Sequence, residues 1–206
     1  MTSQFILASN SHQRRKLLNL LNISFVVVPG IVEEDYSIHL KPEDLVCHFA
    51  LKKAQYVGSQ FPDQIVIGAD TLVVLKGEML GKPSSLSEAR KMLRKLSGKT
   101  HAVLTGVTMV KRCKKAEFTF LEQTDVTFYA LSKKMIDYYV QEYHPLDKAG
   151  AYGIQDWSAC FVKSITGSYH NVVGFPLSKF VQVLRNRHVE NIFGPYNWFG
   201  KVEDRS

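Results

Sequence analysis

The sequence predicts an α/β protein. Short apolar runs rich in β-branched residues alternate with segments in which apolar residues recur at helical spacing, and this alternation is typical of α/β chains. The length of 206 residues suits one large domain or two small lobes. Hydrophobic residues make up 45% of the chain and charged residues 22%, as in ordinary globular proteins. We therefore expect a chain that buries a substantial core.

In the first part of the chain, apolar runs and turn residues predict strands that alternate with helices. The capping residues Ser9, Asn10 and Ser11 separate the first strand from the first helix. The expected elements are a strand at 5–8, a helix at 14–21, a strand at 23–28, an acidic loop at 30–36, a helix at 42–57, a strand at 64–68, an extended stretch at 72–75 and a turn at 76–77.

In the rest of the chain, a capping box predicts where one helix begins. Ser85 and Glu88 stand three residues apart in the S-x-x-E pattern, and Gly98 is suited to end that helix near residue 96. The other expected elements are extended stretches at 101–111 and 117–130 joined by a solvated basic tip at 111–115, a helix at 132–143, a glycine-rich loop at 147–153, a hairpin formed by 160–165 and 169–173, and a last helix at 176–187.

Charge and cysteine content narrow the class of protein. The net charge of +7 favours an anionic partner, which could be nucleic acid, an anionic membrane surface or a phosphorylated small molecule. Cys47, Cys113 and Cys160 form no CxxC or Cys/His pattern, so no zinc site is expected and a reducing cytoplasm fits best. No run approaches the ~20 apolar residues of a membrane span, and residues 1–7 lack the pattern of a secretory leader.

The loop between the first strand and the first helix is a candidate phosphate site. A polar loop that leads into a helix presents unpaired backbone N–H groups at the positive end of the helix dipole. Ser9 and Ser11 add hydroxyl donors, and Arg14 and Arg15 add positive charge. The alternative is a capped helix with a solvated basic turn, since strand–serine–helix patterns are common.

Asp70 is the candidate catalytic carboxylate. It follows the apolar run Ile65–Ala69, and ligands of α/β proteins gather at the carboxyl ends of strands, where a carboxylate can hold a metal or activate water. The acids Glu33, Glu34 and Asp35 could supply a second ligand for Mg²⁺ or Mn²⁺, which prefer oxygen. A capping aspartate and a solvated acidic turn are the alternatives.

Further candidates are two lysines and a glycine-rich segment. Lys53 lies on an expected helix, and Lys82 stands between glycine and proline in a stiff loop that could direct its charge at a phosphate. In the segment 147–155, small residues allow close approach of the backbone, and the Gln155 amide could recognise a base edge. Alone, each of these features is equally consistent with a surface lysine or a connecting loop.

Taken together, these segments resemble the Maf family of nucleoside triphosphate pyrophosphatases. The matching stretches, in order, are Ile6–Ser11 with Arg14, Glu33-Glu34, Lys53-Ala54, Ile67–Thr71, Gly81-Lys82-Pro83, Leu96–His101, Asp147–Gln155, Gly167-Ser168-Tyr169 and Val173–Leu177. The resemblance implies one catalytic domain at 1–190 with an aromatic tail at 191–206. It also implies a two-lobed α/β fold with a mixed, elongated sheet flanked by helices, related to inosine triphosphate pyrophosphatases.

The resemblance also implies an activity and roles for residues. The activity is metal-dependent hydrolysis at the α-phosphate, and the stretch ending in Gln155 resembles the subgroup that acts on dTTP and UTP. Asp70 would act as general base or metal-bound carboxylate, with Glu33 as a second metal ligand. The residues expected to hold the phosphates are Ser9, Ser11, Arg14, Arg15, Lys53, Lys82 and Lys148, and those expected to influence base choice are Gln13, Thr71 and Gln155. Lys53 and Lys82 are also expected to be catalytic, by stabilising charge that develops in the transition state.

One loop departs from the family pattern. Ser11-His12-Gln13-Arg14 stands where the family has Ser-Pro-Arg-Arg, so Gln13 replaces an arginine that is linked to substrate choice. Arg15 is positioned in the sequence to replace the lost charge. Lost or shifted activity in the same fold is therefore one alternative, and a basic protein that binds RNA or a division partner is another. For the enzyme we expect a nucleoside triphosphate as partner and no stable nucleic acid or membrane partner, and a homodimer is allowed.

Overall fold

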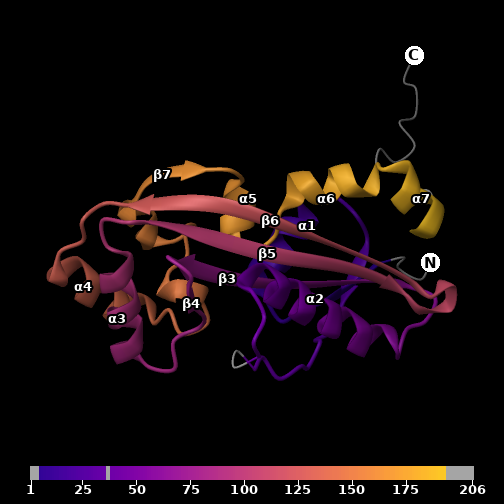
Figure 1. Cartoon of the computed structure of the whole chain (residues 1–206), viewed down its shortest axis with the longest axis horizontal. Coiled ribbons are helices and arrows are strands. Elements are labelled where there is room, and N and C mark those ends of the chain that lie inside the picture. Colours follow the sequence, from indigo (N-terminus) through magenta and orange to yellow (C-terminus); the bar gives the residue numbers. More distant parts are fainter. Residues whose placement is uncertain (1–4, 36–37, 194–206) are drawn as a thin grey trace, which may run out of the picture.

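The computed structural model describes residues 5–35 and 38–193. Within these ranges one mixed sheet of seven strands crosses the whole protein (Figure 1), in the order β2-β1-β3-β5-β6-β7, with β4 paired to one end of β3. The strands are β1 (Phe5–Ala8), β2 (Phe25–Val27), β3 (Ile65–Leu75), β4 (Glu78–Leu80), β5 (Thr100–Lys111), β6 (Ala116–Phe128) and β7 (Val162–Thr166). β1 is parallel to both β2 and β3, and the other pairs are antiparallel.

Helices at the two ends of the long strands form two lobes (Figure 1). The helices are α1 (His12–Asn19), α2 (Pro42–Gly58), α3 (Leu86–Leu96), α4 (Lys133–Tyr143), α5 (Tyr169–Val173), α6 (Leu177–Leu184) and α7 (Arg187–Phe193). In the first lobe, Leu18 and Phe180 pack with Phe5 and Ile67 of the sheet. A second core around Leu93, Tyr139 and Phe161 fills the other lobe. The expected two-lobed α/β architecture is confirmed.

Two glycines bring α2 very close to the sheet. A Cβ at Gly68 of β3 would lie 2.1 Å from the carbonyl oxygen of Ala50, and one at Gly106 of β5 would lie 2.6 Å from that of Val46. No side chain fits in either space, so the helix rests almost directly on the strands. This contact places Lys53, one turn after Ala50, above β3 beside Asp70.

Most expected elements are present, with two corrections. The hairpin expected from 160–165 and 169–173 is wrong in its second arm, which is helix α5. Ser168 caps that helix by accepting a hydrogen bond from the Asn171 N–H at 3.3 Å, and Gly174 ends it with a φ of 123°. The stretches at 64–68 and 72–75 are one continuous strand, β3, that passes through Asp70 without a break.

The last helix and the capping box also differ in detail from the expectation. Residues 176–187 hold α6 and the start of α7, because the Asn186 side chain accepts a hydrogen bond from the His188 N–H at 2.9 Å and begins a new helix. Ser85 caps α3 as expected, but the Glu88 carboxylate bonds to Ser84 in place of the cap residue. Of the expected aromatic tail, 194–206 lie outside the described residues, and Phe193 is buried in the first core.

One smaller expectation is confirmed. The basic segment at 111–115 forms the tip between β5 and β6, with a short 3-10 turn at Arg112–Lys114. Cys47, Cys113 and Cys160 are all free thiols. Among the residues that the structure describes, no helix is long and apolar enough to cross a bilayer.

Candidate active site

A cavity of about 610 Å³ opens between the two lobes. A volume of a few hundred cubic ångströms is typical of small-molecule sites. Side chains from both lobes and from the middle of β3 line it. The lining includes Ser9, Ser11, Gln13, Arg14, Glu34, Lys53, Asp70, Thr71, Lys82, Asp147, Lys148, Tyr152, Gly153 and Gln155.

At one side of the cavity the chain turns from β1 into α1. Ser11 is the cap residue of α1 and accepts a hydrogen bond from the Arg14 N–H at 3.3 Å. The Ser9 hydroxyl accepts a hydrogen bond from the Ser11 N–H at 3.1 Å and shapes the loop before the helix. The first N–H groups of a helix have no partner within it, so this corner of the cavity is suited to an anion.

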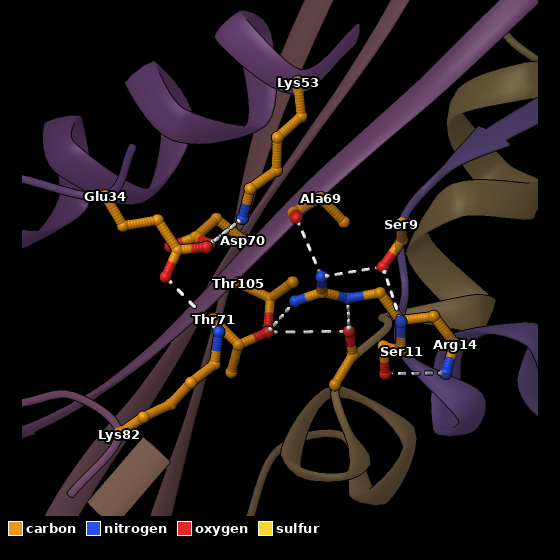
Figure 2. Close-up of polar contacts among 11 residues, drawn as sticks. Ser9, Ser11, Arg14, Glu34, Lys53, Ala69, Asp70, Thr71, Lys82 and Thr105 are labelled. Carbon is orange, nitrogen blue, oxygen red and sulfur yellow. Dashed lines mark hydrogen bonds and ion pairs between the residues drawn. The ribbon is translucent and has the colours of Figure 1, made fainter. Parts of the chain in front are cut away.

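Arg14 joins three separate segments beneath this corner (Figure 2). Its Nε donates to the Gly174 carbonyl oxygen at 2.9 Å, Nη1 to the Ala69 carbonyl oxygen at 2.8 Å, and Nη2 to the Thr71 hydroxyl at 2.9 Å. The side chain is mostly buried. In this structure the guanidinium therefore holds the α1 loop, β3 and the turn after α5 together.

Two carboxylates and two lysines form a cluster at the centre of the cavity (Figure 2). Lys53 Nζ lies 2.6 Å from Glu34 Oε1 and 2.6 Å from Asp70 Oδ1, and Lys82 Nζ lies 3.3 Å from Glu34 Oε2. Asp70 is only 4% exposed, and its second oxygen, Oδ2, is buried without a hydrogen-bond partner. Formally the two positive and two negative charges balance.

The cluster shifts the two acids in opposite directions. Burial acts to raise the pKa of Glu34, but the charges and hydrogen bonds of Lys53 and Lys82 outweigh it and lower the pKa from 4.5 to about 2. For Asp70, burial outweighs the attraction of Lys53 and Arg14, and its pKa is raised. The two pKa values shift in opposite directions for two reasons. Glu34 keeps contact with water and pairs with a second lysine, whereas Asp70 has neither.

Opposite this cluster, the segment 147–155 forms another wall. Lys148 pairs with Asp147 at 2.7 Å, and the Gly150 N–H donates to the Gly81 carbonyl oxygen at 3.0 Å, which ties this wall to the loop of Lys82. Tyr152 is buried behind it, with its hydroxyl 2.9 Å from His101 Nε2. The exposed Gln155 side chain stands at the rim of the cavity.

The structure brings most of the predicted site residues to this one cavity. The predicted residues in its lining are Ser9, Ser11, Gln13, Arg14, Lys53, Asp70, Thr71, Lys82, Lys148 and Gln155. Arg15 and Glu33 are exposed and do not line it. Glu34, which the sequence did not single out from its acidic neighbours, takes the place beside Asp70 that was expected of Glu33.

Glu34 and Asp70 fit a divalent cation only together with further ligands. Within 5–35 and 38–193 no group of three or more acidic, histidine or cysteine side chains could hold a metal. Mg²⁺, however, commonly binds one or two carboxylates together with substrate phosphates and water. The partnerless Oδ2 of Asp70 is an oxygen ligand of the required kind.

Comparison with known proteins gives one consistent answer. The family model described as Maf-like protein matches residues 4–187. A dTTP/UTP pyrophosphatase of Bacillus mycoides is 46% identical, over 88% of this chain and 94% of the relative. A dTTP/UTP pyrophosphatase of Bacillus anthracis is 44% identical, over 91% of this chain and 97% of the relative.

Among solved structures, the Staphylococcus aureus Ham1 protein superposes with a TM-score of 0.44 at 16% identity, over 60% of this chain and 71% of that one. The family match covers nearly the whole sequence, including every segment that contributes to the cavity. The chain therefore belongs to the Maf family.

Proposed function

We propose that this protein is a nucleoside triphosphate pyrophosphatase that hydrolyses dTTP and UTP to the monophosphate and pyrophosphate. The observation that carries the proposal is that the Glu34–Lys53–Asp70 cluster, Lys148 and Gln155 all line one cavity. A cluster of acids and lysines suits phosphate chemistry, and an amide at the rim suits recognition of a base. The relatives that share 44–46% identity carry the name of this activity.

In the proposed mechanism, Asp70 accepts a proton from the water that attacks the α-phosphorus. Its raised pKa makes it a better proton acceptor than an ordinary aspartate, because catalytic bases work best when their pKa approaches the operating pH. Lys53 and Lys82 move from the carboxylates toward the phosphates as the nucleotide brings in negative charge. There they stabilise the charge that develops on the phosphates during bond breaking.

Glu34 and Asp70 are the residues that would hold Mg²⁺ or Mn²⁺, and Glu33 stands outside the cavity. When bound, such an ion would neutralise phosphate charge and polarise the bond to the leaving pyrophosphate. Ser9, Ser11 and the first turn of α1 receive a phosphate group in this proposal. Arg14 acts by fixing that corner, since its hydrogen bonds go to the Ala69 and Gly174 carbonyls and to Thr71.

Gln13 lines the cavity without the charge that an arginine would bring. We therefore propose that Lys148, Lys53 and Lys82 hold the phosphates in this chain. We also propose modified pyrimidine triphosphates as further substrates. The cavity of about 610 Å³ suits one small molecule, so a nucleoside triphosphate is the partner proposed and no stable nucleic acid complex is proposed. A cytoplasmic enzyme is the setting that agrees with three free cysteines.

A panel of triphosphates tests the proposal. Pyrophosphate release is measured for UTP, dTTP, CTP, ATP and GTP with Mg²⁺, with Mn²⁺ and with EDTA. UTP and dTTP should be turned over fastest, only with metal, and the Asp70→Asn variant should lose activity by about 10²–10⁴-fold while remaining folded by circular dichroism. Metal-independent release, or near-normal turnover by the variant, would contradict the assigned roles.

A further inference from the structure

Behind the cavity wall, one buried hydroxyl fixes the backbone of Gly153 on both sides. Ser158 Oγ donates to the Gly153 carbonyl oxygen at 2.8 Å and accepts from the Gly153 N–H at 3.1 Å. The N–H belongs to the peptide before Gly153 and the carbonyl to the peptide after it. A single side chain therefore sets the orientation of both peptide planes, although Ser158 itself is fully buried and does not line the cavity.

Ser158 is in turn fixed to the core of the second lobe. Asp156 accepts a hydrogen bond from the Ser158 N–H at 2.9 Å through one carboxylate oxygen, and from the Tyr139 hydroxyl at 3.1 Å through the other. Tyr139 lies on α4 and is fully buried. Burial raises the pKa of Tyr139, so its hydroxyl remains a donor at any physiological pH. Gly153 is thus tied through Ser158 and Asp156 to a rigid helix.

The backbone of Gly153 supports two side chains that line the cavity. A Cβ at Gly153 would lie 3.0 Å from the Gln155 amide nitrogen and 2.9 Å from Lys148 Cε. Both side chains therefore rest on the bare Cα of this glycine. A movement of the Gly153 peptides would move the Gln155 amide with them, whereas the Lys148 ammonium is held separately by its ion pair with Asp147 at 2.7 Å.

Base choice depends on how firmly the Gln155 amide is held. An amide has a donor side and an acceptor side, and a half turn exchanges them. Uracil presents an N–H donor beside a carbonyl acceptor, whereas cytosine presents a ring nitrogen acceptor beside an amino donor. A glutamine that turns freely can therefore bond to either base, and only a fixed amide separates them.

We propose that Ser158 is a positioning residue for base choice, which acts by fixing Gly153 and through it the Gln155 amide. This inference rests on the proposed function, because it assumes that a uracil or thymine base meets Gln155. Ser158 touches neither the base nor the phosphates. Its loss should weaken the discrimination between pyrimidines and leave the binding of the phosphate chain unchanged.

The test measures binding, so that it does not depend on turnover. Affinities of the full chain for the α,β-imido analogues of UTP and CTP are determined by calorimetry with Mg²⁺. The Ser158→Ala variant should lower the ratio of the two affinities by about tenfold, the equivalent of one lost hydrogen bond of about 1.4 kcal/mol. Affinity for inorganic tripolyphosphate, which has no base, should stay at the wild-type value.

Four further proteins make the result specific. Ser97→Ala is the matched control, because the Ser97 hydroxyl accepts a hydrogen bond from the Leu131 N–H at 2.7 Å in the same lobe but away from the cavity. This variant should keep the wild-type ratio. The double variant of Gln155→Ala with Ser158→Ala should match Gln155→Ala alone, because Ser158 acts only through the amide. Gly153→Ala, which disturbs only the ends of two flexible side chains, should also lower the ratio.

A wild-type ratio in both Ser158→Ala and Gly153→Ala would overturn the inference, as would additive losses in the double variant. A poorly folded Ser158→Ala protein leaves Gly153→Ala to decide. If the wild-type chain bound neither analogue, the proposed function itself would fail together with this inference. An unchanged ratio in the variants, with normal binding by the wild type, would refute the inference alone.

Discussion

Replacement of Lys53 by methionine should destabilise the protein strongly at neutral pH. Glu34 Oε1 and Asp70 Oδ1 each lie 2.6 Å from Lys53 Nζ, so they are at most about 5 Å apart, and the variant leaves both with no cation between them. Two like charges at that distance repel by about 3 kcal/mol at an effective dielectric constant of about 20. The same magnitude, about 3–5 kcal/mol, is typical when one partner of a buried ion pair is removed.

The loss should depend on pH in a defined direction. The folded-state pKa of Asp70 is already raised by burial, and the loss of Lys53 raises it further. A group with a raised folded-state pKa binds its proton more tightly when folded, so the stability of the variant falls as pH rises through that pKa. The loss of stability of Lys53→Met relative to wild type should therefore be larger at neutral pH than at acidic pH.

Thermal unfolding in EDTA measures both effects. A loss of about 3 kcal/mol corresponds to a decrease of roughly 6–12 °C in melting temperature for a chain of this size. Lys95→Met is the matched control, since it breaks an ion pair with Glu78 in which both side chains are about half exposed, and it should cost no more than about 1 kcal/mol. Equal melting temperatures for Lys53→Met and wild type at pH 7.5 would refute the electrostatic argument.

The other predictions concern single residues. Arg14→Lys should lower the free energy of unfolding, measured by urea titration, by about 3 kcal/mol. An ammonium cannot reach the two buried carbonyls and the hydroxyl that the guanidinium joins. An unchanged free energy of unfolding would mean that these hydrogen bonds are dispensable. The wild-type protein should lose stability as pH falls from about 4.5 towards 2, because Glu34 gains a proton over this range. The Glu34→Gln variant should not show this loss in thermal melts followed by circular dichroism. Gly68→Ala should not yield folded protein, because its Cβ would lie 2.1 Å from a backbone oxygen of α2. Gly58→Ala, within α2, should express normally, because the nearest atom to its Cβ is Cγ of the flexible Arg112 side chain at 3.2 Å.

The helix positions could be predicted because local signals mark their ends. Ser11, Ser85 and Ser132 each accept a hydrogen bond from a backbone N–H in the first turn of a helix, as their place before an apolar period indicated. The segment Tyr169–Val173 shows the limit of this method. Its short apolar run fits a strand as well as a helix, and the contacts that favour the helix, such as Asn171 Nδ2 to the Val103 carbonyl, come from distant β5.

The composition of the site was largely predictable, but the role of each residue was not. Asp70 and Lys53 lie on a strand and a helix, which fix the direction of their side chains into the cavity. Glu33 and Glu34 lie in a loop without periodicity, so nothing in the sequence indicates which of them faces inward. Arg14 finds its partner in the carbonyl of Gly174, 160 positions away, and no local pattern reports such a contact.

The unbroken course of β3 restricts how this enzyme can respond to a nucleotide. β3, β5 and β6 run side by side from one lobe to the other, and their paired register continues on both sides of Asp70. A hinge between the lobes would have to tear this ladder of backbone bonds. We therefore expect any closure around a substrate to come from the surface segments that carry Glu34, Lys82 and Lys148, while Asp70 keeps its place in the sheet.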